Sequence, residues 1–119
     1  MLLVEDNAQV RDFAAKLLRD LQCDVTPSPD GADALEKVLA EDFDLVFSDV
    51  VMPGLSGVQL AERIEEERPG LPVVLATGFS EELLGAHAGR FTVVAKPYDG
   101  ATLAAAIATA AAKGKSRAA

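Results

Sequence analysis

Short apolar runs alternate along the chain with longer stretches in which apolar residues recur every three or four positions. Each of the five runs predicts a strand, and each stretch that follows predicts an amphipathic helix. The expected strands are Leu2–Val4, Asp24–Thr26, Leu45–Ser48, Val73–Ala76 and Thr92–Ala95. This regular alternation predicts an α/β fold in which a parallel sheet is covered by helices on both faces.

The first three helices carry start or stop signals. Asn7 is the expected N-cap of the first helix. The second helix is expected from about Ala32 to Ala40, and the third starts near Ser56 and ends at Pro69-Gly70, which cannot continue a helix. Their spacing predicts the following core-facing residues: Val10, Phe13, Ala14, Leu17, Leu18 and Leu21, then Ala34, Leu35, Val38 and Leu39, then Val58, Leu60, Ala61 and Ile64.

The last part of the chain contains one weak and one strong helical pattern. The weak helix, from Glu81 to about Ala88, is interrupted by glycine. The strong helix begins behind Asp99 as N-cap, buries residues such as Leu103 and Ile107, and is expected to fade at Gly114. We therefore expect one domain over residues 1–112, followed by a basic flexible tail over residues 113–119.

Composition and charge narrow the cellular location and the binding partners that we expect. The chain of 119 residues has 19 acidic and 11 basic residues and a formal charge of -8, which disfavours direct nucleic-acid binding. No apolar run reaches the roughly 18 residues of a membrane span, and the first strand breaks off into Glu5 too early for a signal peptide. The lone Cys23, interpreted as a buried thiol on a strand, requires no oxidising compartment. We expect a cytoplasmic protein without direct membrane contact.

Polar side chains stand at the carboxyl ends of four predicted strands. Glu5 and Asp6 follow the first strand and Asp49 the third, while Thr77 and Lys96 end the fourth and fifth. Parallel α/β sheets bind their ligands at this edge. Three carboxylates suit Mg²⁺, which prefers oxygen ligands beside a substrate phosphate, and a lysine would offset their mutual repulsion. The pattern indicates a site for a divalent cation and a phosphoryl group.

Each of these residues also has a simpler interpretation. Glu5 and Asp6 can be an acidic cap of the first helix, and Asp49 can form an Asx turn. Lys96 can be an ordinary surface lysine, and Thr77 an ordinary strand residue. Their shared position at strand ends, in one consistent order along the chain, favours a common site.

The ordered set of motifs resembles the receiver domain of bacterial two-component signalling. The resemblance rests on the segments Leu3–Asn7, Leu45–Gly57, Ala76–Gly78 and Ala95–Tyr98, and it covers roughly residues 2 to 112. It implies a doubly wound (βα)5 sandwich of the flavodoxin-like type, with a parallel five-stranded sheet of order 2-1-3-4-5.

The resemblance also implies the role of each site residue. Asp49 would be the phosphoacceptor, and Mg²⁺ would be held by Glu5, Asp6, Asp49 and the backbone carbonyl of Val51. Thr77 would hydrogen-bond the phosphoryl oxygens and Lys96 would pair with them. The phosphoryl group would come in line from a phosphohistidine of a sensor histidine kinase or a histidine phosphotransfer protein. A homodimer is also compatible with this interpretation.

Such a domain is a conformational switch that assists its own phosphorylation and dephosphorylation, and it is not an enzyme. The segment 68–79 is similar to receivers at the C-terminus of hybrid sensor histidine kinases. Many receivers carry an aromatic residue three positions before the lysine, where this chain has Val93. Two alternatives are a phosphorylation-independent interaction module and a small Mg²⁺-dependent aspartyl-phosphate phosphatase, which would usually need an acid where Val51 stands.

Overall fold

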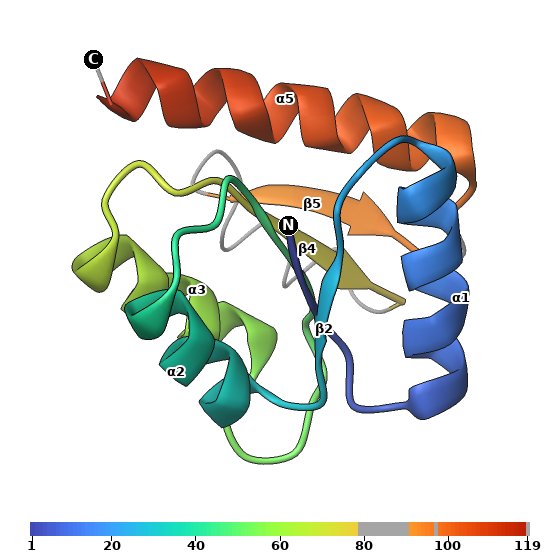
Figure 1. Ribbon diagram of the computed structural model, residues 1–119, viewed down its shortest axis with the longest axis horizontal. Helices are drawn as coiled ribbons and strands as arrows, with labels where there is room; N and C mark the ends of the chain where they lie inside the picture. Colours follow the sequence, from blue (N-terminus) through green and yellow to red (C-terminus); the bar gives the residue numbers. More distant parts are fainter. Residues whose placement is uncertain (79–90, 97, 119) are drawn as a thin grey trace.

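A computed structural model describes residues 1–78, 91–96 and 98–118, with the backbone alone for residues 113–118. The strands are β1 (Leu2–Val4), β2 (Thr26–Ser28), β3 (Val46–Asp49), β4 (Val73–Thr77) and β5 (Thr92–Ala95). The helices are α1 (Ala8–Asp20), α2 (Gly31–Ala40), α3 (Gly57–Glu67) and α5 (Gly100–Ala118) (Figure 1). The weak helix expected between Glu81 and Ala88 lies outside the described residues.

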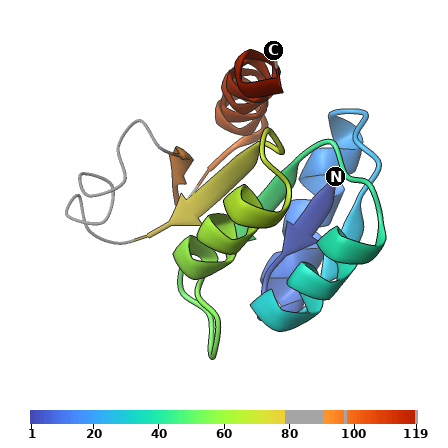
Figure 2. The same ribbon diagram turned by 90° about the vertical axis from the view of Figure 1, so that its left-hand side faces the viewer.

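All strand pairs are parallel, and the sheet has the order β2-β1-β3-β4-β5. This confirms the expected fold class and strand order. The helices form two layers, with α1 and α5 on one face of the sheet and α2 and α3 on the other (Figures 1 and 2). No helix within the described ranges is long and apolar enough to cross a membrane.

The two faces of the sheet carry separate apolar cores. Leu2 and Val4 of β1 point toward α2 and α3, where they pack with residues such as Leu60. Leu3 points to the opposite face and packs with residues such as Leu18 of α1 and Leu103 of α5. Because successive strand residues alternate between faces, a sheet buried on both sides needs uninterrupted apolar runs, which explains the run at the start of the chain.

The second strand lies two residues later than expected. In the structure Leu2 is in register with Thr26 and Val4 with Ser28, so the expected strand Asp24–Thr26 was wrong in position. β2 contains Pro27, which has no N–H to donate, but β2 is an edge strand, where such a residue is tolerated. Cys23 consequently precedes the strand and is half-buried, which corrects its expected position on a strand.

Three expectations about the helices were also wrong. Phe13 is 57% exposed and Leu39 is 46% exposed, although both were expected in the core. The buried side of α1 centres on Leu18 with Ala14 and Ala15 beside it, and Phe13 lies about 140° around the helix from Leu18. The last helix continues through Gly114 to Ala118 instead of fading there.

The start of α3 lies unusually close to the end of β3. A Cβ atom built on Gly57 would stand 2.1 Å from the backbone oxygen of Asp49, and the N–H of Gly57 donates to the oxygen of Val50 (2.9 Å). A capping box between Ser56 and Gln59 fixes this first turn. Only glycine allows α3 to approach the backbone that carries Asp49 so closely.

We therefore expect Gly57→Ala to lower the free energy of unfolding by about 1–3 kcal/mol, because the backbone at Asp49 must move to admit the methyl group. Urea unfolding measures the change. Gly100→Ala is the matched control, since a Cβ there meets nothing within 4 Å, and its effect should stay within about 0.5 kcal/mol. Equal stability of Gly57→Ala and the native sequence would contradict the close approach.

Candidate functional site

The parallel register brings four of the predicted site residues to one edge of the sheet. Val4 is paired with Ser48, so Glu5 and Asp49 leave neighbouring strands at the same level. Asp49 is in turn paired with Ala76 of β4, the residue before Thr77. Thr77 is paired with Ala95, and Lys96 follows directly. The site predicted at the carboxyl ends of the strands is therefore assembled by strand pairing.

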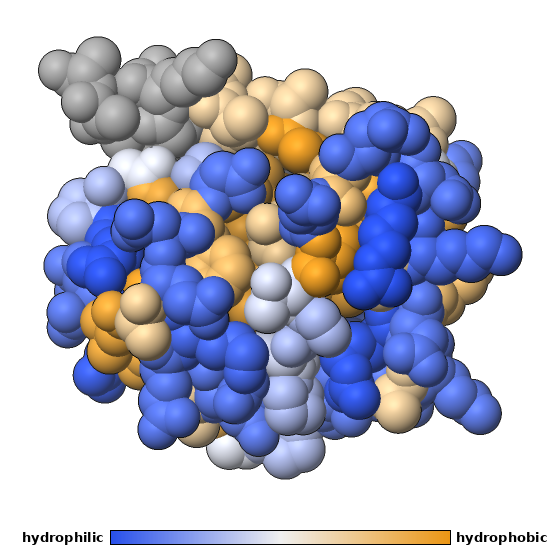
Figure 3. Space-filling view, in the orientation of Figure 1, coloured by the Kyte–Doolittle hydropathy of each residue, from blue (hydrophilic) through white to orange (hydrophobic). Residues whose placement is uncertain are grey.

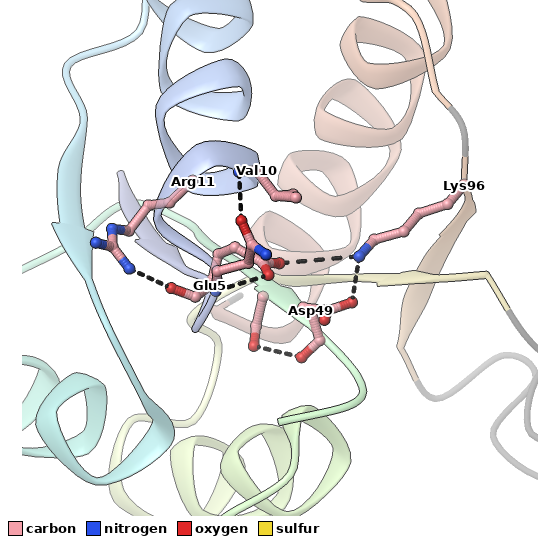
Figure 4. A network of polar contacts seen from close by, with 7 residues as sticks. Glu5, Val10, Arg11, Asp49 and Lys96 are labelled. Carbon is pink, nitrogen blue, oxygen red and sulfur yellow. Dashed lines mark hydrogen bonds and ion pairs between the residues drawn. The ribbon is translucent and has the colours of Figure 1, made fainter. Parts of the chain in front are cut away.

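Lys96 connects the two buried carboxylates of this edge. Its ammonium group lies 2.8 Å from Oδ1 of Asp49 and 3.8 Å from Oε2 of Glu5, and Figure 4 shows the side chain reaching across from β5. The side chains of Glu5 and Asp49 are 7% and 10% exposed, whereas that of Lys96 is 30% exposed. Lys96 thus offsets the negative charge of two buried carboxylates, and it is not an isolated surface residue.

Three carboxylates are clustered at the same place. Glu5, Asp6 and Asp49 each offer an oxygen, and these oxygens all lie within 4.8 Å of one another. Asp6 is exposed while the other two are buried, so the cluster opens toward solvent on one side. Hard oxygen ligands with room for water are what Mg²⁺ requires, so the donor set fits this ion.

Burial and charge perturb Glu5 most. Burial, together with repulsion from Asp49, raises the pKa of Glu5 from 4.5 to about 7, although the N–H of Asn7 and the charge of Lys96 act in the opposite direction. Asn7 donates to Oε1 of Glu5 at 3.2 Å. Nη1 of Arg11 donates to the backbone oxygen of Glu5 at 2.8 Å and fixes the loop from the side of α1 (Figure 4).

The structure also bears on the simpler interpretations. The N-cap of α1 is Asn7, as predicted, and its side chain accepts from the N–H of Val10 at 3.0 Å. Glu5 and Asp6 therefore do not occupy the N-cap position. The carboxylate of Asp49 is paired with Lys96, and its backbone oxygen accepts from the hydroxyl of Ser48 at 2.9 Å. The contacts with Lys96 keep the carboxylates of Glu5 and Asp49 in the common cluster.

The structure shows the positions of two further predicted site residues, Thr77 and Val51, but it does not test their roles. Thr77 is buried, with 3% exposure, at the end of β4, and its backbone oxygen accepts from the N–H of Lys96 at 2.8 Å. Val51 lies two residues beyond Asp49 and is 61% exposed, so the loop that would supply its carbonyl is at the surface. The roles of both residues remain predictions.

Three residues near the site were not predicted from the sequence. Arg11 stands one helical turn after Asn7, a spacing that places both on one side of α1, but nothing in the sequence shows that its side chain turns back to the loop. Gly57 follows a capping serine, which marks a helix start without revealing the contact beneath it. Tyr98 packs edge-on against Phe47, with ring centroids 5.6 Å apart and an interplanar angle of 84°.

The pKa of Tyr98 is also affected by the cluster. Burial, with smaller contributions from Glu5 and Asp49, raises the pKa of its phenol to about 12. The ring packs against Phe47, which precedes Asp49 by two residues on β3, and Tyr98 itself follows Lys96 by two residues. The aromatic pair thus joins the two strand ends that carry the lysine and its carboxylate partner.

Comparison with known proteins identifies the family to which this fold belongs. The sequence matches the response regulator receiver domain family over residues 1–108. The chain belongs to this family. It is a receiver domain of two-component systems. The chain is 37% identical over 110 residues to the transcriptional regulatory protein CseB of Streptomyces coelicolor, and the aligned region covers 90% of this chain and 47% of CseB. The chain therefore spans about half the length of that relative.

Smaller relatives match over most of their length. Chemotaxis protein CheY-3 of Vibrio cholerae is 37% identical over 109 residues, covering 87% of this chain and 84% of CheY-3. The receiver domain of the hybrid histidine kinase CckA is 32% identical, with a TM-score of 0.76 and coverage of 92% and 96%. The receiver of sensor histidine kinase PA1611 from Pseudomonas aeruginosa, solved with magnesium in its active-site cleft, is 25% identical, with a TM-score of 0.83 and coverage of 93% and 95%.

The perturbed carboxyl group of Glu5 gives a test of the site by pH. Glu5 holds its proton more tightly in the folded protein than in the unfolded chain, because its pKa is raised to about 7. This contribution to stability is fully present below about pH 4.5 and is lost as the pH rises through about 7. Glu5→Gln, which stays neutral, should therefore be more stable than the native sequence at pH 8 by about 1–3 kcal/mol, and equally stable near pH 4.

Urea unfolding at several pH values without Mg²⁺ measures this difference. Glu66→Gln, on the exposed side of α3, is the matched control and should leave the pH profile unchanged. Added Mg²⁺ should reduce the advantage of Glu5→Gln at pH 8, because a bound cation favours the ionised carboxylate. If the free energy of unfolding of Glu5→Gln varied with pH in parallel with that of the native sequence, the pKa of Glu5 would not be raised in the folded protein.

Proposed function

We propose that Asp49 accepts a phosphoryl group from a phosphohistidine on a sensor histidine kinase or a histidine phosphotransfer protein, and that the phosphorylated domain then changes conformation. The observation that carries this proposal is the arrangement of Lys96 between Asp49 and Glu5. Asp49 is the acid nearest the ammonium group among these contacts, and it ends the central strand β3, with β1 and β4 on either side.

The transfer requires charge neutralisation more than covalent assistance. An Oδ atom of Asp49 attacks the phosphorus while the bond between phosphorus and the imidazole nitrogen breaks, and the histidine leaves with the electron pair of that bond. Negative charge gathers on the phosphoryl oxygens during this step. Lys96 is the proposed ionic partner of those oxygens, and the hydroxyl of Thr77 is the proposed hydrogen-bond donor to them.

The acidic cluster would hold Mg²⁺. Glu5, Asp6 and Asp49 supply carboxylate oxygens within 4.8 Å of one another, and the exposed loop at Val51 is the proposed source of a backbone carbonyl. When bound, the ion supplies further positive charge against the phosphoryl oxygens. Without it, the three carboxylates face one ammonium group among the described residues, that of Lys96, so the net charge of the cluster opposes the approach of an anionic phosphoryl donor.

The surface beside the site is compatible with a protein as the phosphoryl donor. Phe13 lies in the second turn of α1, whose first turn follows the Glu5 loop, and it is 57% exposed. Val51, in the loop beyond Asp49, is 61% exposed. Single exposed apolar side chains are common on protein surfaces, and contiguous apolar patches are what mark contact sites, so these two residues are compatible with a protein donor but do not identify its surface. We propose that the donor binds over α1 and the loop after β3.

The alternatives are less well supported. A phosphatase of this kind would usually need a second acid where the exposed Val51 stands. An interaction module independent of phosphorylation gives no reason to bury the two carboxylates of Glu5 and Asp49 side by side, which costs desolvation energy. We infer a phosphoacceptor domain of residues 1–112 that assists its own phosphorylation and is not itself an enzyme, located in the cytoplasm with its kinase. A place within a hybrid histidine kinase remains a prediction, supported by the similarity to the CckA and PA1611 receivers.

Asp49→Asn should abolish the uptake of a phosphoryl group, because the amide is not a nucleophile toward phosphorus. Incubation with acetyl phosphate and Mg²⁺ should add one phosphoryl mass to the native protein and none to the variant, as measured by intact mass spectrometry. Asp20→Asn, at the exposed end of α1, is the control and should be phosphorylated like the native protein. A full-level adduct on Asp49→Asn would place the acceptor elsewhere.

Lys96→Ala should leave the fold intact but separate phosphorylation from the conformational change. The ammonium group is the contact that moves from the Asp49 carboxylate to the phosphoryl oxygens, and alanine cannot follow them. NMR spectra with and without the phosphate mimic beryllofluoride should show shifts near Asp49 in the variant but much smaller shifts elsewhere. Lys16→Ala, on the exposed side of α1, should behave like the native protein. Wild-type shifts throughout Lys96→Ala would exclude the lysine as the link.

A further inference from the structure

A groove lies at the amino-terminal edge of the sheet, opposite the phosphoryl site. Its volume is about 910 Å³, and its lining includes Val38, Phe43, Leu45, Leu71 and Ile107. These apolar side chains come from α2, from the loops before β3 and β4, and from α5. Figure 3 shows apolar surface below α5 on this face, bordered by hydrophilic side chains. The groove therefore combines an apolar floor with a polar border.

The border of the groove is strongly acidic. Five exposed carboxylates line it, and they belong to Asp24, Glu41, Asp42, Asp44 and Glu67. The amino group of Met1 pairs with Asp44 at 3.2 Å. Arg68 also lines the groove, where its guanidinium donates to the backbone oxygen of Leu39 at 3.1 Å. The carboxylates outnumber these two cationic groups, so the border favours a basic occupant.

A basic segment of the same chain begins next to the groove. Ile107 and Ala111 of α5 form part of the wall, and Lys113, Lys115 and Arg117 follow within six residues of Ala111. The stretch of α5 from residue 100 to residue 112 contains no charged residue. The helical backbone continues to Ala118, and α5 runs straight across the molecule (Figure 1). The backbone therefore does not fold the tail back over its own groove.

We propose that the groove is a docking site for a second copy of the chain, in which the basic tail of each copy lies along the acidic border of the other. A two-fold interface must be self-complementary, since the same patch is used by both partners. This patch satisfies that condition because it contains an acidic border and a basic tail side by side. A two-fold axis near Ala112 would set the ends of the two α5 helices antiparallel and place each tail over the partner's groove.

The dimer should be weak and sensitive to salt. Stable interfaces bury about 800 Å² per partner, and a single groove with one short tail is a small patch by that standard. Exposed ion pairs are also screened at moderate ionic strength. We expect association in the range of tens to hundreds of micromolar, weakened about tenfold between 50 mM and 500 mM salt.

Sedimentation equilibrium of the untagged chain over a range of concentrations tests the proposal with two charge reversals. Lys113→Glu with Lys115→Glu should weaken the dimer about tenfold or more, as should Asp42→Lys with Glu67→Lys. The two pairs combined keep the net charge of the native chain and should restore the dimer. Glu36→Lys with Glu66→Lys, at exposed positions outside the groove, makes the same change of charge as the border variant and should leave the dimer intact.

A zero-length carboxyl–amine cross-linker on a mixture of unlabelled and ¹⁵N-labelled chains identifies the occupant directly. Cross-links between tail lysines and border carboxylates should join labelled with unlabelled copies. A chain that stays monomeric at all concentrations, charge reversals without effect, or cross-links confined to single copies would each overturn the proposal. Phosphoryl uptake by these variants should equal that of the native chain, because Asp49 lies at the other edge of the sheet, so the proposal is tested independently of the phosphoacceptor role.

Discussion

The ion pair between Lys96 and Asp49 is the contact on which the rest of the site depends. Glu5 and Asp49 stand on adjacent strands with little exposure to water, so their charges repel each other strongly. Lys96 lies within 4.0 Å of both carboxylates. Its charge does not fully offset the cost, because the pKa of Glu5 is still raised. The site is therefore held in a state that additional positive charge relieves, which is the property a cation-dependent phosphoacceptor needs.

The sequence predicted the part of the site that strand pairing determines. In a parallel sheet all strands point the same way, so residues that follow β1, β3, β4 and β5 must meet at one edge. Glu5, Asp49, Thr77 and Lys96 could be named from the pattern for this reason. The α/β fold class, which followed from the alternation of strands and helices, and the strand order, which followed from the resemblance, were both confirmed.

The errors arose where a local pattern did not determine the tertiary contact. Phe13 has the spacing of a core residue, but the buried side of α1 runs through Ala15 and Leu18, and Phe13 lies outside it. The position of β2 was wrong because proline generally disfavours a strand, whereas the edge strand β2 tolerates Pro27, and the local pattern does not show which strand lies at the edge. The contacts of Arg11 and Gly57 depend on backbone geometry across two elements, and no spacing rule within one element reveals them.

The same geometry indicates which part of the site can respond to phosphorylation. The backbone at Asp49 and Val50 is fixed by the N–H of Gly57, by the close approach of α3 and by pairing with β4. In contrast, the carboxylate of Asp49 is paired with a long side chain that is partly exposed. A change of charge at the carboxylate should therefore leave β3 in place and act on the groups that face it. Because Thr77 ends β4 and Lys96 directly follows β5, the response would begin on that side of the sheet.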